Sequence, residues 1–97
     1  MASGCIIDIE ITRSEFDKIQ NCCNVTLSEF NQFYISEESL AHILAEVKEF
    51  PKDIGERCYS KYTNTKNFEN HLLLGFQFIV KENTIPMEEN NGNTNRN

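Results

Sequence analysis

The segment ISEESLAHILAEVKEFP, residues 35–51, constrains the fold of this chain more than any other. Ser36 is a suitable N-cap, because its hydroxyl can accept a hydrogen bond from an unpaired backbone N–H of the first helical turn. Pro51 cannot continue a helical hydrogen-bond ladder, and it pushes the residue before it out of helical geometry. Between them, apolar residues recur at intervals of three and four, which gives one apolar stripe: Leu40, Ile43, Leu44, Val47 and Phe50. We therefore predict an amphipathic helix over residues 37–49.

A helix with one apolar stripe must pack against another element, and two segments supply strand patterns for this role. Residues 6–12 alternate between isoleucine and polar side chains, which is typical of a half-buried strand. Residues 71–80, HLLLGFQFIV, are largely apolar on both sides, which favours a central strand. Strict alternation would place five of them on one face: Leu72, Leu74, Phe76, Phe78 and Val80. Gly75 indicates a bulge or a close approach of backbone within this strand.

Three further segments have weaker patterns. Thr12 and Glu15 have capping-box spacing, so residues 14–22 are interpreted as a short helix, with a continued irregular strand as the alternative. Residues 25–35 fit one or two short strands, with a turn or bulge near Ser28.

The segment ERCYSKYT, residues 56–63, alternates after the turn PKDIG, which suggests an exposed or edge strand. The chain is then predicted to be α+β: a small, mainly antiparallel sheet with one amphipathic helix packed across a face. Residues 1–82 form a single domain in this interpretation. Residues 83–97 are rich in asparagine, have few side chains to bury, and are predicted to be a disordered tail.

The charge of the chain bears on its partners. Nine basic and fifteen acidic side chains among 97 residues give a net charge of −6, which disfavours binding to nucleic acid.

The N-terminal sequence MASGCIIDIEITR lacks a signal-peptide core or a spanning segment, so the predicted location is cytoplasmic, away from membranes. The cysteines have no CxxC spacing and are interpreted as free, mostly structural side chains: Cys5, Cys22, Cys23 and Cys58.

The outer face of the predicted helix carries the candidate site. Its side chains point away from the apolar stripe, and we predict that they contact either solvent or a protein partner: Glu38, His42, Glu46, Glu49 and Asp53. A metal site that uses His42, and His71 from the apolar strand, is the alternative, in which the chain is a small metal-dependent enzyme. Because no catalytic signature or metal-binding spacing accompanies these residues, no catalytic residue, metal or cofactor is assigned.

One resemblance adds to this interpretation. The segments ESLAHILAEVKEFPKDIGERCYSKYT and NHLLLGFQFIV resemble small bacterial domains related to polymorphic-toxin immunity proteins. In those domains a helix ends in Phe-Pro, and a strand and then a hydrophobic strand follow. The matching residues are Leu40, Ile43, Val47, Phe50, Pro51, Cys58, Tyr62, Leu74 and Phe76. The resemblance covers about half of the chain, and this sequence departs from it in having few residues after Val80.

The expected function is therefore that of a non-catalytic protein-binding domain. The resemblance implies an immunity protein that neutralises a cognate bacterial toxin, with the acidic surface covering a basic toxin domain. The alternative is a structural or assembly subunit, a homo-oligomer that self-associates through its sheet.

Overall fold

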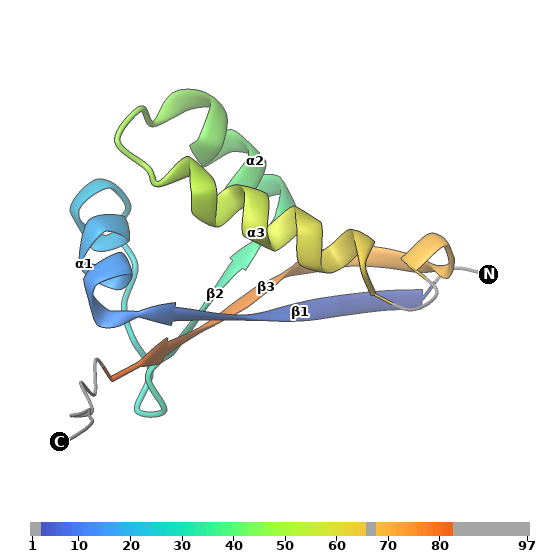
Figure 1. The fold of residues 1–97 in the computed structure, drawn as a ribbon, viewed down its shortest axis with the longest axis horizontal. Coiled ribbons are helices and arrows are strands. Elements are labelled where there is room, and N and C mark those ends of the chain that lie inside the picture. Colours follow the sequence, from blue (N-terminus) through green and yellow to red (C-terminus); the bar gives the residue numbers. More distant parts are fainter. Residues whose placement is uncertain (1–2, 66–67, 83–97) are drawn as a thin grey trace, which may run out of the picture.

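The computed structural model describes residues 3–65 and 68–82 (Figure 1). This part of the chain has a three-stranded sheet with helices gathered over one of its faces. The strands are β1 (Ser3–Thr12), β2 (Gln32–Ser36) and β3 (His71–Lys81). The helices are α1 (Arg13–Cys22), α2 (Glu37–Glu46) and α3 (Lys52–Thr63), with a 3-10 turn at Phe68–Asn70. The α+β prediction is confirmed, and the predicted tail, residues 83–97, lies outside the described residues.

The sheet is mixed, so the prediction of a mainly antiparallel sheet is corrected. Its strand order is β1-β3-β2, in which β3 pairs in parallel with β1 and antiparallel with β2. The last of the described strands, β3, therefore lies in the centre, as its two apolar faces predict. A parallel pair needs a long crossover connection, and here α1, β2, α2 and α3 all belong to it.

Helix α1 confirms the weaker of the two helix predictions. The hydroxyl of Thr12 accepts a hydrogen bond from the Glu15 amide at 3.1 Å, and the Glu15 carboxylate accepts one from the Thr12 amide at 2.9 Å. This capping box begins the helix immediately where β1 ends. Phe16 and Ile19 are then buried against the sheet.

Helix α2 begins as predicted, with the Ser36 hydroxyl accepting from the Ser39 amide at 3.1 Å. It ends at Glu46, three residues before the predicted end, because Val47 already has extended geometry. The residues after it reverse the chain, and Phe50 enters the core with 2% of its surface exposed. Pro51 therefore lies beyond the chain reversal that follows α2, and it does not itself end that helix.

Helix α3 replaces the predicted turn and edge strand over residues 51–63, which was wrong. Pro51 is the N-cap residue of this helix, and its φ of −66° suits a helix start. Ile54 and Cys58 are fully buried and lie four residues apart, with half-buried Tyr62 four residues further on. That spacing forms a helical stripe, whereas the short alternation in ERCYSKYT also fits a strand. The strand that the resemblance implies at Cys58 and Tyr62 is a helix.

The segment before β2 is also corrected. Only residues 32–36 form a strand, and Val25 and Leu27 lie in a half-buried loop. The Ser28 hydroxyl accepts hydrogen bonds from the Phe30 and Gln32 amides, and Asn31 adopts the left-handed conformation with φ 58°. The predicted turn near Ser28 is confirmed.

One core lies between the helices and the covered face of the sheet. Its aromatic centre is a stack of Phe33 on Phe78, with ring centroids 4.9 Å apart, and Phe16 packs against Phe33. The remaining buried hydrophobic residues are Ile7, Ile9, Ile11, Ile19, Ile35, Leu40, Phe50, Ile54, Cys58, Phe76 and Val80.

Substitution of Leu40 by alanine tests this packing. Leu40 is fully buried, so Leu40→Ala should lower the free energy of unfolding by roughly 2–5 kcal/mol through lost burial and a residual cavity. Leu44 is only half-buried against Gly55, so Leu44→Ala should cost clearly less. Urea unfolding followed by circular dichroism measures both. Equal losses for the two variants would contradict the packing of α2 described here.

Candidate functional site: the open face of the sheet

The register of β1 against β3 shifts by one residue near the start of the two strands. Cys5 pairs with Leu73, but the next residue, Ile6, pairs with Gly75, so Leu74 is an additional residue in β3. The bulge predicted at Gly75 is confirmed. It changes which face the even-numbered residues of β3 occupy, because an inserted residue reverses the alternation of side chains.

The bulge corrects the predicted single face of β3. Phe76, Phe78 and Val80 are buried under the helices, whereas Leu72 and Leu74 lie on the opposite, open face. Strict alternation across ten residues had placed all five side chains together. The open face thus receives two leucines that the core would otherwise hold.

Four large hydrophobic side chains are exposed on this open face near the start of β1 and β3. Leu72 is 60% exposed, Ile6 50%, Tyr34 47% and Leu74 45%. We call these four residues the apolar half of the open face. They come from all three strands, since Tyr34 belongs to β2. Single exposed hydrophobic residues are common, whereas a contiguous group makes this surface the candidate site of the described residues.

Two glycines keep the apolar half flat. A Cβ atom on Gly4 would lie 2.7 Å from Cδ1 of Leu74, and one on Gly75 would collide with the hydroxyl oxygen of Tyr34. Leu74 and Tyr34 therefore lie across the glycines and not upright from the sheet. The Tyr34 hydroxyl also donates a hydrogen bond to the Leu74 carbonyl oxygen at 2.9 Å, which fixes the ring in this position. The result is a low, preformed apolar surface.

The other end of the open face is polar. Asp8, Glu10 and Lys81 lie there, beside Gln77 and the half-buried Ile79. Lys81 pairs with Glu10 at 3.7 Å, and both side chains are more than half exposed, so this ion pair is worth little energetically. We call this end the polar half. Because β1 and β3 are parallel, both strands run from the apolar half to the polar half.

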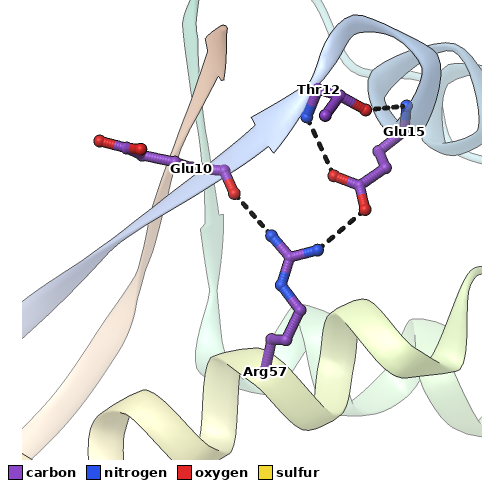
Figure 2. A network of polar contacts seen from close by, with 4 residues as sticks. All are labelled: Glu10, Thr12, Glu15 and Arg57. Atoms are coloured by element: carbon purple, nitrogen blue, oxygen red, sulfur yellow. Dashed lines mark hydrogen bonds and ion pairs between the residues drawn. The ribbon is translucent and has the colours of Figure 1, made fainter.

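The outer edge of β1 is partly occupied by two cations of α3, Arg57 and Lys61, of which Figure 2 shows Arg57. Arg57 donates to the backbone carbonyl of Glu10 and to the Glu15 carboxylate, the latter at 2.8 Å. Lys61 donates to the carbonyl of Asp8 at 2.8 Å. In an edge strand, alternate carbonyls point away from the sheet and can pair with another strand. Here two of these carbonyls already accept hydrogen bonds. Arg57 connects α3 both to β1 and to the capping box of α1.

A shallow groove of about 690 Å³ runs between β1 and α3. It is lined by Ile9, Glu10, Asp53, Glu56, Arg57, Ser60, Lys61 and Asn64. Its two cations are the ones that hold the β1 carbonyls, so their charge already serves the fold. Among the described residues that line the groove, no cation is left unengaged for an acidic ligand.

The predicted site residues lie away from the open face. Three of them follow one another at intervals of four along α2, Glu49 lies in the turn after it, and Asp53 lies in the first turn of α3: Glu38, His42, Glu46, Glu49 and Asp53. All five are exposed, and within the described part of the chain none of their side chains forms a hydrogen bond or ion pair. The helices and the turn between them do expose these five side chains, four acidic residues and His42, outward as predicted. Whether it binds a partner stays a prediction.

The sequence did not single out Ile6, Leu72 and Tyr34 as site residues. The available signal was that both faces of residues 71–80 are apolar, together with an isoleucine pair, Ile6 and Ile7, that must point to opposite faces. A sheet with helices over one face cannot bury both sets.

The cysteines and the other possible metal ligands of the described residues do not come together in a metal site. Over residues 3–65 and 68–82, no group of three or more His, Cys, Asp or Glu side chains is placed to hold a metal ion, and the four cysteines are free. The sulfurs of Cys22 and Cys23 are 3.9 Å apart. Burial raises the pKa of the Cys58 thiol from 9.0 to about 12. Burial, with a smaller contribution from Cys22, raises that of Cys23 to about 11.

Comparisons with protein-family models, curated proteins and solved structures found no match for this chain. None of the helices in the described part of the chain is long and apolar enough to cross a membrane.

Loss of Arg57 should weaken the connection between α3 and the rest of the fold. Arg57→Ala removes two hydrogen bonds, and because Arg57 is 42% exposed we expect a loss of only about 1 kcal/mol in the free energy of unfolding. Lys18→Ala, which removes an exposed cation of α1, is the matched control. Urea unfolding measures both, and an unchanged midpoint for Arg57→Ala would show that the network contributes nothing.

The buried thiol gives a pH-dependent expectation. Because the folded-state pKa of Cys58 is raised, the unfolded chain releases this proton from about pH 9 while the folded chain retains it. The contribution of Cys58 to stability is thus fully present below pH 9 and declines between about pH 9 and 12. In native protein at pH 8, iodoacetamide should modify Cys58 only after unfolding, whereas Cys5 should react faster. Equal labelling rates, read by mass spectrometry, would contradict the burial.

Proposed function

We propose that this chain is a non-catalytic protein-binding domain that acts as an assembly subunit, and that a second copy of the chain binds to its open face. The single observation that carries the proposal is the apolar half: Ile6, Tyr34, Leu72 and Leu74, 45–60% exposed on one surface. Transferring such surface out of water is favourable, and three strands supply it side by side.

The apolar half is where charge repulsion between two copies is smallest. Two chains of net charge −6 repel each other over most of their surfaces. The four side chains of the apolar half carry no charge, so two copies can meet there without bringing like charges together. The flat packing over Gly4 and Gly75 also suits a second flat sheet, because facing sheets pack about 10 Å apart.

The area of the apolar half sets the expected affinity between two copies. Three strands about 4.8 Å apart, over about five residues of 3.3 Å each, cover roughly 250 Å² of sheet. A standard stable interface buries about 800 Å² per partner. We therefore expect a reversible, concentration-dependent dimer and not a permanent one.

Light scattering after size exclusion, with sedimentation equilibrium from micromolar to millimolar concentration, tests this proposal on the full chain. The wild-type chain should shift from monomer to dimer, and Leu72→Glu should shift the dissociation constant upward by at least tenfold, because it places a charge in the contact. Leu72 is 60% exposed, so the monomer should still fold. Phe30→Glu is the matched control, since Phe30 is 69% exposed but lies in the turn before β2.

A wild-type chain that remains monomeric at millimolar concentration would contradict the proposal. So would equal effects of the two substitutions. If residues 83–97 covered the open face instead, a chain ending at Glu82 would dimerise while the full chain remained monomeric.

A second candidate function rests on the outward acidic set of α2 and the start of α3. These side chains are exposed, and the proposed pairing leaves them accessible on the helical side of each copy. They suit a basic protein surface, such as the toxin domain that the resemblance implies. Co-expression with the product of a neighbouring toxin-like gene should restore growth. Glu38→Gln with Glu46→Gln should reduce the rescue, and failure of the wild-type chain to rescue would count against this candidate.

A further inference from the structure

We infer that the two copies pair with their strands antiparallel and offset, so that only the two apolar halves overlap. This inference rests on the proposed self-association through the open face. It adds the orientation of the second copy and the residues that meet, which follow from the polarity of the face along its strands.

Along the strands, the open face changes from apolar to polar side chains. Ile6 pairs with Gly75, and the next outward residue of β1, Asp8, pairs with Gln77. On β2, Tyr34 pairs with Gln77 and is therefore level with Asp8, but its ring reaches back over Gly75 to the Leu74 carbonyl. Gln32 pairs with Ile79, further along the face. The boundary is therefore stepped on β2, where the ring of Tyr34 carries the apolar half back toward Leu74.

A parallel arrangement is unfavourable for electrostatic reasons. With the strands of both copies in one direction, the polar halves would face each other across about 10 Å. Each polar half holds Asp8 and Glu10 against Lys81, which gives −2 + 1 = −1. Asp8 has no cation partner among the described residues, so two such carboxylates would lose solvent contact while facing like charge.

A fully overlapped antiparallel arrangement has a different cost. It would place Lys81 and Glu10 of one copy on the leucines of the other, and both charged side chains would lose water without gaining a partner. Sliding the copies apart along the strands removes this contact. The apolar halves then cover each other, and the polar halves extend into solvent at opposite ends.

This arrangement is a closed two-fold pair. In such an isologous contact the same surface of each copy faces the other, so that if residue i contacts residue j of the second copy, residue j contacts residue i of the second copy. The apolar half can therefore pair with itself. Leu74 and Tyr34, which lie flat over Gly4 and Gly75, then form the centre of the contact, and Leu72 and Ile6 surround them.

Photo-cross-linking of the full chain distinguishes these arrangements. A p-benzoylphenylalanine at position 72 should cross-link two chains, because it lies within the overlap. The same residue at position 81 should give no cross-link to the partner's β3, because Lys81 lies outside it. Position 30 serves as the control for non-specific capture. Denaturing gels give the yield, and mass spectrometry of the linked peptides should identify residues 4–6 and 72–74.

The outcomes separate the orientation from the association itself. Cross-links between two copies at position 81 would show a parallel or fully overlapped pair, which overturns this inference and leaves self-association intact. Cross-links at position 30 with none at 72, or a chain that is monomeric in sedimentation, would overturn both.

A charge substitution gives an independent measurement. In the offset pair the polar halves are far apart, so Asp8→Asn should change the dissociation constant by less than twofold at 0.15 M salt, where charges beyond about 8 Å are screened. Asp17→Asn on α1 is the matched control for net charge. A parallel pair predicts that Asp8→Asn tightens the dimer several-fold relative to that control, and this result would overturn the inference.

Discussion

The pairing of β3 with both other strands is the interaction on which the whole structure depends. In the described residues β1 and β2 do not pair with each other, so every backbone hydrogen bond between strands involves β3. This strand also contributes Phe76, Phe78 and Val80 to the core, and Phe78 stacks on Phe33 of β2. Among the described strands β3 comes last in the chain. The covered face and the open face therefore take shape only when residues 71–81 insert between strands that precede them by some 35–70 residues.

Elements with local signals could be predicted from the sequence. The reciprocal Thr12–Glu15 cap, the Ser36 cap and the central position of β3 all follow from side chains within a few residues of each other. Helix α3 lacks such a signal, since no side chain caps its first residue. Over eight residues, ERCYSKYT satisfies a period of two as well as a helical period. Burial of Ile54 and Cys58 against the sheet decides in favour of the helix, and that contact is a tertiary one.

The open face could be predicted only in part. An excess of apolar side chains over what one small core can hold is visible in residues 71–80, but their assignment to faces is not, because it depends on the extra residue at Leu74. A one-residue insertion exchanges the two sides of a strand, so any prediction by alternation fails beyond it. Gly75 marks the position of the bulge. The need for it becomes evident only when Tyr34 is seen to occupy the space that a side chain would fill.

The outer edge of β1 limits where another strand can join the sheet. Along the outer edge of β1, Arg57 and Lys61 occupy the carbonyls of Glu10 and Asp8, so another strand cannot extend the ladder at these positions without displacing charge-assisted hydrogen bonds. The same cations keep α3 over β1, on the side away from the open face. Pairing of another strand with the outer edge of β1 is therefore opposed by the contacts that hold the fold together. The exposed leucines remain accessible to a partner that approaches the sheet from its open face.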